Sequence, residues 1–134
     1  MKNPQIRAAV LAALKRNIPD SDGVTWFDGR PAILDAQDLP AVAVYLTDAQ
    51  YTGAVLDEDE WSATLHIELF LRADSPDTAL DQWVESRIYP ALTDIPELAD
   101  LIETLSPQGY DYQRDDEIAT WGSADMQYSI TYIM

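Results

Sequence analysis

The chain has 134 residues, of which 47% are hydrophobic, and this is enough for one compact domain with a core of its own. It carries 24 acidic and 8 basic residues, which gives a formal net charge of −16. This charge argues against binding to nucleic acid or to an anionic membrane, because both require basic side chains. Cations, basic partners or salt-dependent self-association suit it better.

Two further features of the composition exclude classes of protein. The chain has no cysteine, so disulfides, thiolate metal sites and cysteine nucleophiles are excluded. No stretch reaches the roughly 18 apolar residues of a membrane span. The apolar run between Arg7 and Lys15 is too short for a signal peptide.

Basic residues are concentrated at the N-terminus, where the first 16 residues contain four of the eight bases and no acid. One interpretation is that Lys15 and Arg16 end a helix, whose dipole favours positive charge there. The other is that this basic helix meets the acidic surface of a neighbouring subunit. We favour the first interpretation and leave the second open.

The first predicted element is an amphipathic helix that ends near Asn17. Asn3 is a suitable N-cap, and Pro4 suits the first helical position. One helical face carries the apolar residues Ile6, Val10, Ala13 and Leu14.

Three strands are predicted next. The stretch 24–33 predicts a short strand followed by a turn at Asp28-Gly29. The strand over 40–46 is apolar on both faces, as in the interior of a sheet. From Trp61 the sequence alternates, which predicts a long strand with one buried face. The buried face is expected to carry Trp61, Ala63, Leu65, Ile67, Leu69 and Leu71. The other face carries Ser62, Thr64, His66, Glu68 and Arg72, with Phe70 as an exception.

Two helices and two strands complete the predicted chain. A helix over 75–89 is expected to end before Pro90, and a shorter helix over 96–105 follows. Strands are predicted over 109–114 and 124–134. The last strand alternates polar residues with Met126, Tyr128, Ile130 and Tyr132.

The grouping of the helices decides the predicted fold class. They do not alternate with every strand, which favours an α+β fold: a single mixed, largely antiparallel β-sheet with helices packed on one face. We see no internal repeat or linker, so a single domain over 1–134 is predicted.

The segment AVLDEDEWSATLHIELFL (54–71) contains the first candidates for a site. A calcium-binding loop that started at Asp57 would have Trp61 at its fifth position, where an oxygen ligand is required. It would have Ser62 at its sixth position, where a glycine is required, so we reject a dedicated calcium loop. We interpret the acidic run 57–60 as a solvated connection between two strands that attracts divalent cations loosely. His66 is the only histidine, so a multi-histidine metal site is excluded, and we expect it on the solvated face of its strand.

A catalytic role for His66 needs a nucleophile and an orienting acid nearby. The same strand face offers Ser62, Thr64 and Glu68, but no nucleophile-elbow glycine pattern accompanies them. Closely spaced acids elsewhere do not indicate a glycosidase, because 24 acids form close pairs by chance. We therefore predict no catalytic, cofactor-binding or dedicated metal-binding residues.

Six tyrosines lie on or beside predicted strands. They are typical either of half-buried packing on a sheet or of a subunit interface, and the pattern does not separate the two. They are Tyr45, Tyr51, Tyr110, Tyr112, Tyr128 and Tyr132.

Seven blocks, in order over nearly the whole chain, resemble the minor tail protein U family of lambda-like phages, the tail terminators. The blocks are IRAAVLAAL (6–14), FDGRPAI (27–33), PAVAVYLTDAQYTG (40–53), LDEDEWSATLHIELFL (56–71), LDQWVESRIYP (80–90), GYDYQRDD (109–116) and SADMQYSITYIM (123–134). None is a catalytic signature, but their combination is specific. The spacing departs from the family at 17–25 and 105–109.

The resemblance implies a structural protein with no enzymatic activity and no cofactor. Such proteins form a six-membered ring that caps the tail tube, stops its polymerisation and provides the surface for head–tail joining. The implied partners are further copies of the chain, the tail tube protein and a head-completion or connector protein. DNA passes through the ring without sequence-specific binding, and no membrane is involved. The implied location is the head-proximal end of the virion tail, after assembly in the host cytoplasm.

A closed ring requires two different patches on each subunit. The basic first helix and the acidic remainder are one candidate pair. Closing six subunits multiplies the charge of −16 sixfold. We therefore expect the isolated protein to be monomeric or weakly associating, and the ring to be promoted by salt or by non-specific binding of magnesium.

Six residues are candidates for the oligomer or tail-tube interface. Arg30 is one of only four bases after residue 16, and it lies in a predicted turn. The candidates are Arg30, Tyr51, Gly53, Arg114, Lys15 and Arg16.

Two other functions remain as alternatives. An acidic DNA mimic that inhibits a DNA-binding protein would account for the charge, and a small hydrolase would use His66. Neither accounts for the ordered blocks.

Overall fold

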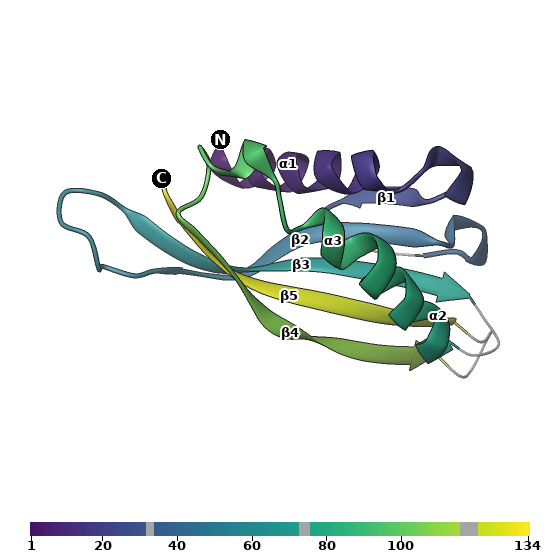
Figure 1. The fold of residues 1–134 in the computed structure, drawn as a ribbon. Coiled ribbons are helices and arrows are strands. Elements are labelled where there is room, and N and C mark those ends of the chain that lie inside the picture. Colours follow the sequence, from purple (N-terminus) through teal and green to yellow (C-terminus); the bar gives the residue numbers. More distant parts are fainter. Residues whose placement is uncertain (32–33, 73–75, 116–120) are drawn as a thin grey trace.

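The computed structural model describes residues 1–31, 34–72, 76–115 and 121–134, without the side chains of residues 36, 76, 114, 115 and 121. One five-stranded sheet has the strand order β1-β2-β3-β5-β4, and the helices lie on one of its faces (Figure 1). Short β1 runs parallel to β2, whereas all other pairs are antiparallel. The strands are β1 (Thr25–Asp28), β2 (Ala41–Tyr51), β3 (Glu60–Arg72), β4 (Thr104–Asp115) and β5 (Trp121–Ile133). The predicted α+β fold is confirmed.

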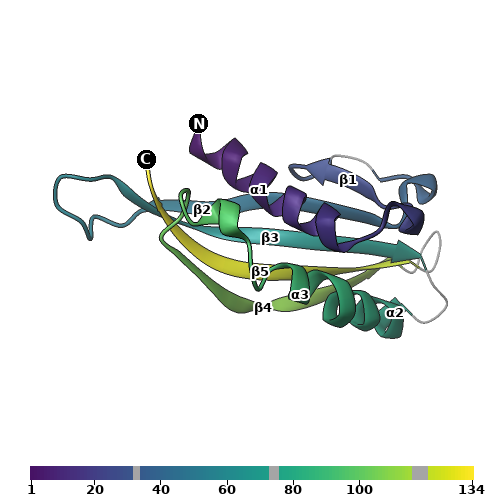
Figure 2. The same cartoon turned by 45° about the horizontal axis from the view of Figure 1, so that its top comes forward.

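Helix α1 (Lys2–Asn17) covers the β1–β2 side of the sheet, and α2 (Pro76–Trp83) covers the β3–β5 side (Figure 2). The predicted apolar face of α1 is confirmed, since Ile6, Val10 and Leu14 are fully buried. The N-cap prediction was wrong, because α1 begins at Lys2 and Asn3 lies inside it. The amide of Asn3 instead hydrogen-bonds the hydroxyl of Tyr132.

The alternation predicted from residue 61 onward is confirmed. The odd positions of β3 face the core beneath the helices, and β2 is buried on both faces from Ala41 to Tyr45. The segment 52–59 joins β2 to β3 and projects beyond the end of the sheet (Figure 1); we call it the arm. Three residues of the acidic run, 57–59, lie in this connection between two strands, and Glu60 begins β3.

The second predicted helix runs further than expected. After α2 the chain makes a π turn over Val84–Ile88 and continues as α3 (Tyr89–Ala91), so Pro90 does not end the helix. Proline normally clashes with the preceding turn of an α-helix and lacks the N–H that would bond to it. The wider π turn ends at Ile88, two residues before Pro90, and makes room for the proline ring.

The predicted helix over 96–105 was wrong. Only a 3₁₀ turn forms, over Pro96–Leu98, and β4 already begins at Thr104. The backbone N–H of Glu103 donates to Thr131 of β5 at 2.7 Å, and Leu105 pairs with Ile130. Sheet pairing therefore overrides the helical spacing of the leucines in this segment.

The second face of the sheet is not simply solvated. A small cluster of Ala41, Ala43, Tyr45 and Phe70 packs there with Phe27, Leu34 and Leu39. This explains why Phe70 breaks the alternation of β3. His66 and Glu68 on the same face are only 9% and 4% exposed, so the expectation of a wetted His66 was wrong.

Candidate functional site

His66 is the centre of a buried polar network on the face away from the helices. Its Nε2 lies 2.6 Å from the Thr47 hydroxyl, and its Nδ1 lies 2.8 Å from a carboxylate oxygen of Asp125. These partners are not the Ser62, Thr64 and Glu68 that the sequence pattern offered. Thr47 comes from β2 and Asp125 from β5, the two neighbours of β3, so only the strand order reveals them.

Tyr45 and Glu68 form the second part of this network. The Tyr45 hydroxyl donates to the Glu68 carboxylate at 2.7 Å, and the Tyr45 ring stacks on His66 with 4.6 Å between centroids. Burial, and then the hydrogen bond to Glu68, raise the pKa of Tyr45 well above its ordinary value. The guanidinium of Arg30 lies 5.7 Å from the centroid of the same ring.

The connectivity of Thr47, His66 and Asp125 is that of a nucleophile, a base and an orienting acid. Catalysis also needs a cavity that places a substrate next to the nucleophile. The pocket between the π turn and strands β4 and β5 lies on the opposite, helix-covered face of the sheet. The network instead satisfies buried polar groups across three strands, which holds the strands in register.

Within the described part of the chain, no three histidine or carboxylate side chains come close enough together to hold a metal ion. No helix among the described residues is both long and apolar enough to cross a membrane.

Tyr51 and Gly53 lie at the base of the arm. The Tyr51 ring is 55% exposed and contacts Trp61 edge-on, with 5.9 Å between centroids. Gly53 has φ +65°, a conformation that favours glycine. The Thr52 hydroxyl donates to the Glu60 carboxylate at 2.8 Å. The arm therefore has an ordered base, and its tip presents Leu56, which is 91% exposed.

The basic residues of α1 have partners within the chain. Arg16 binds the Glu97 carboxylate through two nitrogens, at 2.5 and 3.2 Å, and the Lys15 ammonium lies 5.9 Å from the Trp26 ring centroid. These contacts favour the helix-end interpretation of the N-terminal charge. The side chain of the remaining candidate, Arg114, lies outside the described residues.

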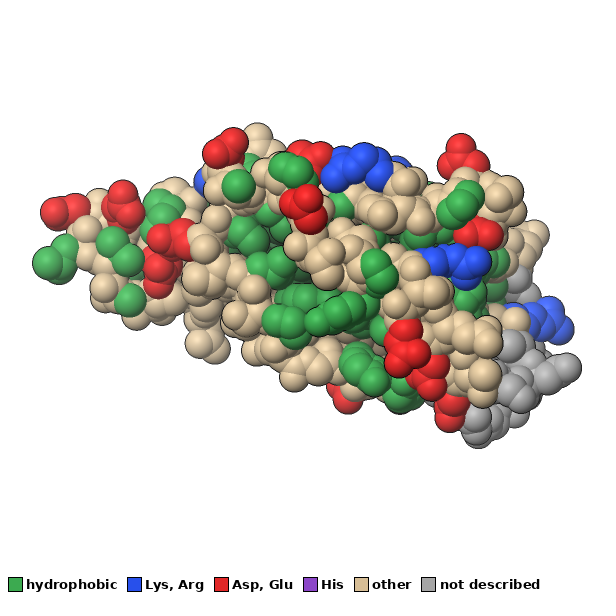
Figure 3. All heavy atoms as spheres, in the orientation of Figure 1, with side chains coloured by type: hydrophobic (Ala, Val, Ile, Leu, Met, Phe, Trp, Pro, Cys, Tyr) green, Lys and Arg blue, Asp and Glu red, His purple; other side chains and the backbone are tan. Residues whose placement is uncertain are grey.

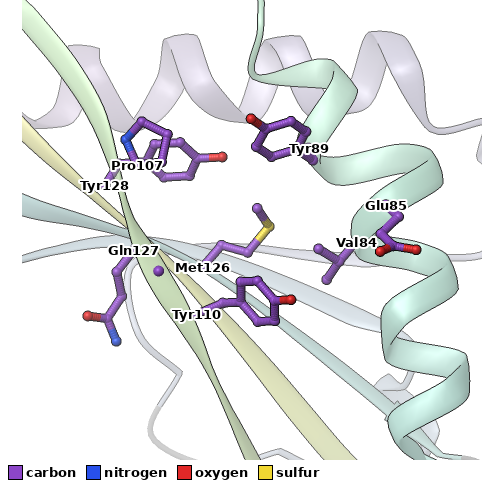
Figure 4. Close-up of a pocket in the computed structure, with 9 residues that line it drawn as sticks. Val84, Glu85, Tyr89, Pro107, Tyr110, Met126, Gln127 and Tyr128 are labelled. Atoms are coloured by element: carbon purple, nitrogen blue, oxygen red, sulfur yellow. The ribbon is translucent and has the colours of Figure 1, made fainter.

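The structure also shows a tyrosine-lined pocket that sequence reasoning missed. It has a volume of about 300 Å³ and lies between the π turn with α3 on one side and β4 with β5 on the other (Figure 4). Tyr89 and Tyr110 are about half exposed at its rim, whereas Tyr128 is 4% exposed. In the space-filling view, hydrophobic side chains gather in this region (Figure 3). The sequence does carry a signal for this pocket: Tyr110 and Tyr128 lie on neighbouring strands at positions whose side chains point to the same, core-facing side of the sheet.

Comparison with known proteins decides the family. The family model described as phage minor tail protein U matches residues 1–132. The chain belongs to the phage minor tail protein U family. The family resemblance seen in the sequence blocks is thereby confirmed, and this member of the U family is a structural component of a phage tail.

Two curated relatives align with this U-family chain over its full length and over their own full length. The tail tube terminator protein of Escherichia phage lambda is 58% identical over 134 residues, and that of Escherichia phage N15 is 57% identical. A chain from the virion of a native gene transfer agent particle has a TM-score of 0.58 at 13% identity, over 96% of this chain and 95% of that one. This last similarity is one of fold.

Proposed function

We propose that this U-family protein terminates the phage tail tube. Six copies close into a ring that caps the head-proximal end of the tube, stops its polymerisation and offers the surface to which the head is joined. The observation that carries this proposal is the full-length identity of 57–58% with two proteins named tail tube terminator.

The shape of the subunit supports a ring. A closed ring needs a heterologous contact, in which one patch of a subunit meets a different patch of the next. The Arg30 turn follows β1 at one edge of the sheet, and the tyrosine-lined pocket adjoins β4 at the other edge. Two different surfaces therefore lie at opposite edges of one sheet.

The charge of the subunit supports control of assembly by cations. Each copy adds a formal charge of −16, so closing the ring works against repulsion that salt screens. Within one subunit, a hydrogen bond to Glu60, followed by desolvation, raises the pKa of the Glu103 carboxyl. Crowded carboxylates of this kind attract magnesium non-specifically and release it readily.

The interface candidates take different places in this proposal. Arg30 faces the next subunit, whereas Tyr51 and Gly53 hold the arm for contact with a neighbour or with the tail tube protein. Lys15 and Arg16 serve the subunit itself through their contacts with Trp26 and Glu97. DNA passes through the ring without being held, because an acidic channel wall has no basic groups that could replace the counterions of the DNA phosphates.

Sedimentation of the purified protein in a magnesium and salt titration tests the ring. We expect a monomer at low ionic strength, and a species of six subunits with six-fold class averages in negative stain after magnesium or salt is added. A protein that remains monomeric under all of these conditions, and is also absent from tail ends, would contradict the proposed function.

A further inference from the structure

The floor of the tyrosine-lined pocket contains a polar group with no partner. The Tyr128 ring is almost fully buried, and its hydroxyl makes no hydrogen bond in the structure. Figure 4 shows this hydroxyl directed into the space between Pro107 and Tyr89. A buried hydroxyl without a partner is unfavourable, so the pocket is incomplete without an occupant that supplies a polar atom.

The walls of the pocket define the chemistry of that occupant. Tyr89 and Tyr110 offer aromatic surface, and Glu85 is an exposed acid among the lining residues. Aromatic faces and a carboxylate both attract a cation. Burial raises the pKa of Tyr128 to about 12, so its oxygen stays neutral and can accept a hydrogen bond from an N–H donor. An arginine side chain fits the aromatic surface, the carboxylate and the hydrogen-bond acceptor, because it carries a guanidinium on an apolar stem.

Arg30 is such a group on this chain. Three other arginines each have a carboxylate partner: Arg7 with Asp28, Arg16 with Glu97 and Arg87 with Asp22. Arg30 is exposed, and the contact that the structure gives it is the Tyr45 ring at 5.7 Å. A contact of that kind at an exposed site is weak, so Arg30 can leave it at little cost.

Arg30 cannot fill the pocket of its own chain. It follows β1, and the pocket adjoins β4, which is four strand spacings away across the sheet. At about 4.8 Å per spacing the separation is roughly 19 Å. The opposite charges and the opposite edges therefore point to a second copy of the chain.

We propose that Arg30 of one subunit enters the tyrosine-lined pocket of the next, where it pairs with Glu85 and donates to the Tyr128 hydroxyl. Repeated around the ring, this head-to-tail contact joins the β1 edge of each subunit to the β4 edge of its neighbour. The inference rests on the proposed ring and names the surfaces that close it.

A charge exchange between the two partners tests the contact. Arg30→Glu and Glu85→Arg should each lower the fraction of protein in rings at least tenfold at a magnesium concentration where the wild type assembles. The double variant should recover most of that loss, because the pair is restored with its charges reversed. Arg72→Glu is the matched control, since it changes the charge by the same amount at an exposed arginine on β3 and should leave assembly near the wild-type level.

A second cycle isolates the Tyr128 hydroxyl. Tyr128→Phe keeps the ring in place and should weaken assembly, but it should have no further effect in Arg30→Ala protein, because the donor is already missing. Thermal unfolding of each monomer checks that the variants fold.

The outcomes separate the inference from the proposed function. Wild-type rings together with Arg30 and Glu85 variants that assemble normally would overturn the contact and leave the ring standing. Single-variant defects that the double exchange does not relieve would also overturn it. Arg30→Glu protein that forms normal rings but fails to join tube or head would assign Arg30 to another partner. Failure of the wild type to form rings both in solution and at tail ends would refute the ring itself.

Discussion

A carboxylate oxygen of Asp125 lies 2.8 Å from Nδ1 of His66, although 59 positions separate the two residues in the chain. The pairing of β3 with β5 brings them together, and the Thr47 hydroxyl lies on the other ring nitrogen. When the ring is neutral, it donates Nδ1–H to Asp125 and accepts the Thr47 hydroxyl at Nε2. The only histidine of this U-family protein thus ties three strands together.

Removing the acid of this pair should destabilise the subunit. Asp125→Ala leaves a buried imidazole N–H without an acceptor, which lowers the free energy of unfolding by about 1–3 kcal/mol. Urea denaturation measures the change. Asp94→Ala, at an exposed position, is the control and should alter stability by less than about 0.5 kcal/mol. Equal effects of the two substitutions would refute a structural role for the network.

The buried tyrosines should make the protein sensitive to alkali. The pKa of Tyr45 is raised in the folded state, so its contribution to stability is complete below the unfolded value of about 10 and is lost as the pH rises through the folded value. We expect Tm to fall with increasing pH above about 10. Tyr45→Phe should lower Tm at pH 7, because the Glu68 carboxylate loses its hydrogen-bond donor. Above about pH 10 the Tm of this variant should fall less steeply with pH than that of the wild type, because the variant lacks the hydroxyl that ionises. Parallel curves from pH 8 to 11 would contradict this account.

Two exposed glutamates should respond to neutralisation in opposite directions. Glu60 raises the pKa of the Glu103 carboxyl, so the ionised form of Glu103 is unfavourable in the fold at neutral pH. Arg16 lowers the pKa of Glu97, so there the ionised form is favourable. Glu103→Gln should therefore raise Tm at pH 7 and Glu97→Gln should lower it. The Glu103 difference should disappear as the pH falls below the ordinary glutamate pKa of about 4, whereas the Glu97 difference should persist until the pH falls through the lowered pKa of the folded state. Shifts of the same sign would refute the assignment.

Tyr128→Phe should stabilise the isolated subunit even though it weakens assembly. The substitution removes a buried hydroxyl that has no partner, so the free energy of unfolding should rise by about 1 kcal/mol. Tyr132→Phe is the comparison, because the Tyr132 hydroxyl is bonded to Asn3 and its loss should not stabilise the fold. Denaturation of both variants as monomers at low salt distinguishes them. A destabilised Tyr128→Phe monomer would show that the hydroxyl is already satisfied.

Much of this fold follows from local pattern. The period of two in β3 and β5 and the apolar stripe of α1 identify their buried faces, because one face of each element packs in a single core. The segment 96–105 was misread, because leucines at helical spacing also suit a 3₁₀ turn followed by a strand. Whether Pro90 ends a helix depends on the width of the turn before it, which composition does not encode.

The candidate interface was harder to predict than the fold. Arg30 could be singled out, because a base in a turn of an acidic chain is rare. The pocket could not, because its residues come from a π turn and from two strands, and only tertiary packing joins them. The sequence alone also did not separate tyrosines that pack in the fold from tyrosines that are exposed for an interface. The structure buries Tyr45, Tyr128 and Tyr132 and exposes Tyr51, Tyr89, Tyr110 and Tyr112.

The most direct test of termination is the growth of tail tubes in the presence of the purified protein. Polymerising tail tube protein of the same phage should stop elongating when the wild-type protein is added, and electron microscopy should show one six-fold ring at a single end of each tube. Arg30→Glu protein should leave tubes growing. Tubes that elongate at an unchanged rate and carry no ring with the wild-type protein would contradict the account.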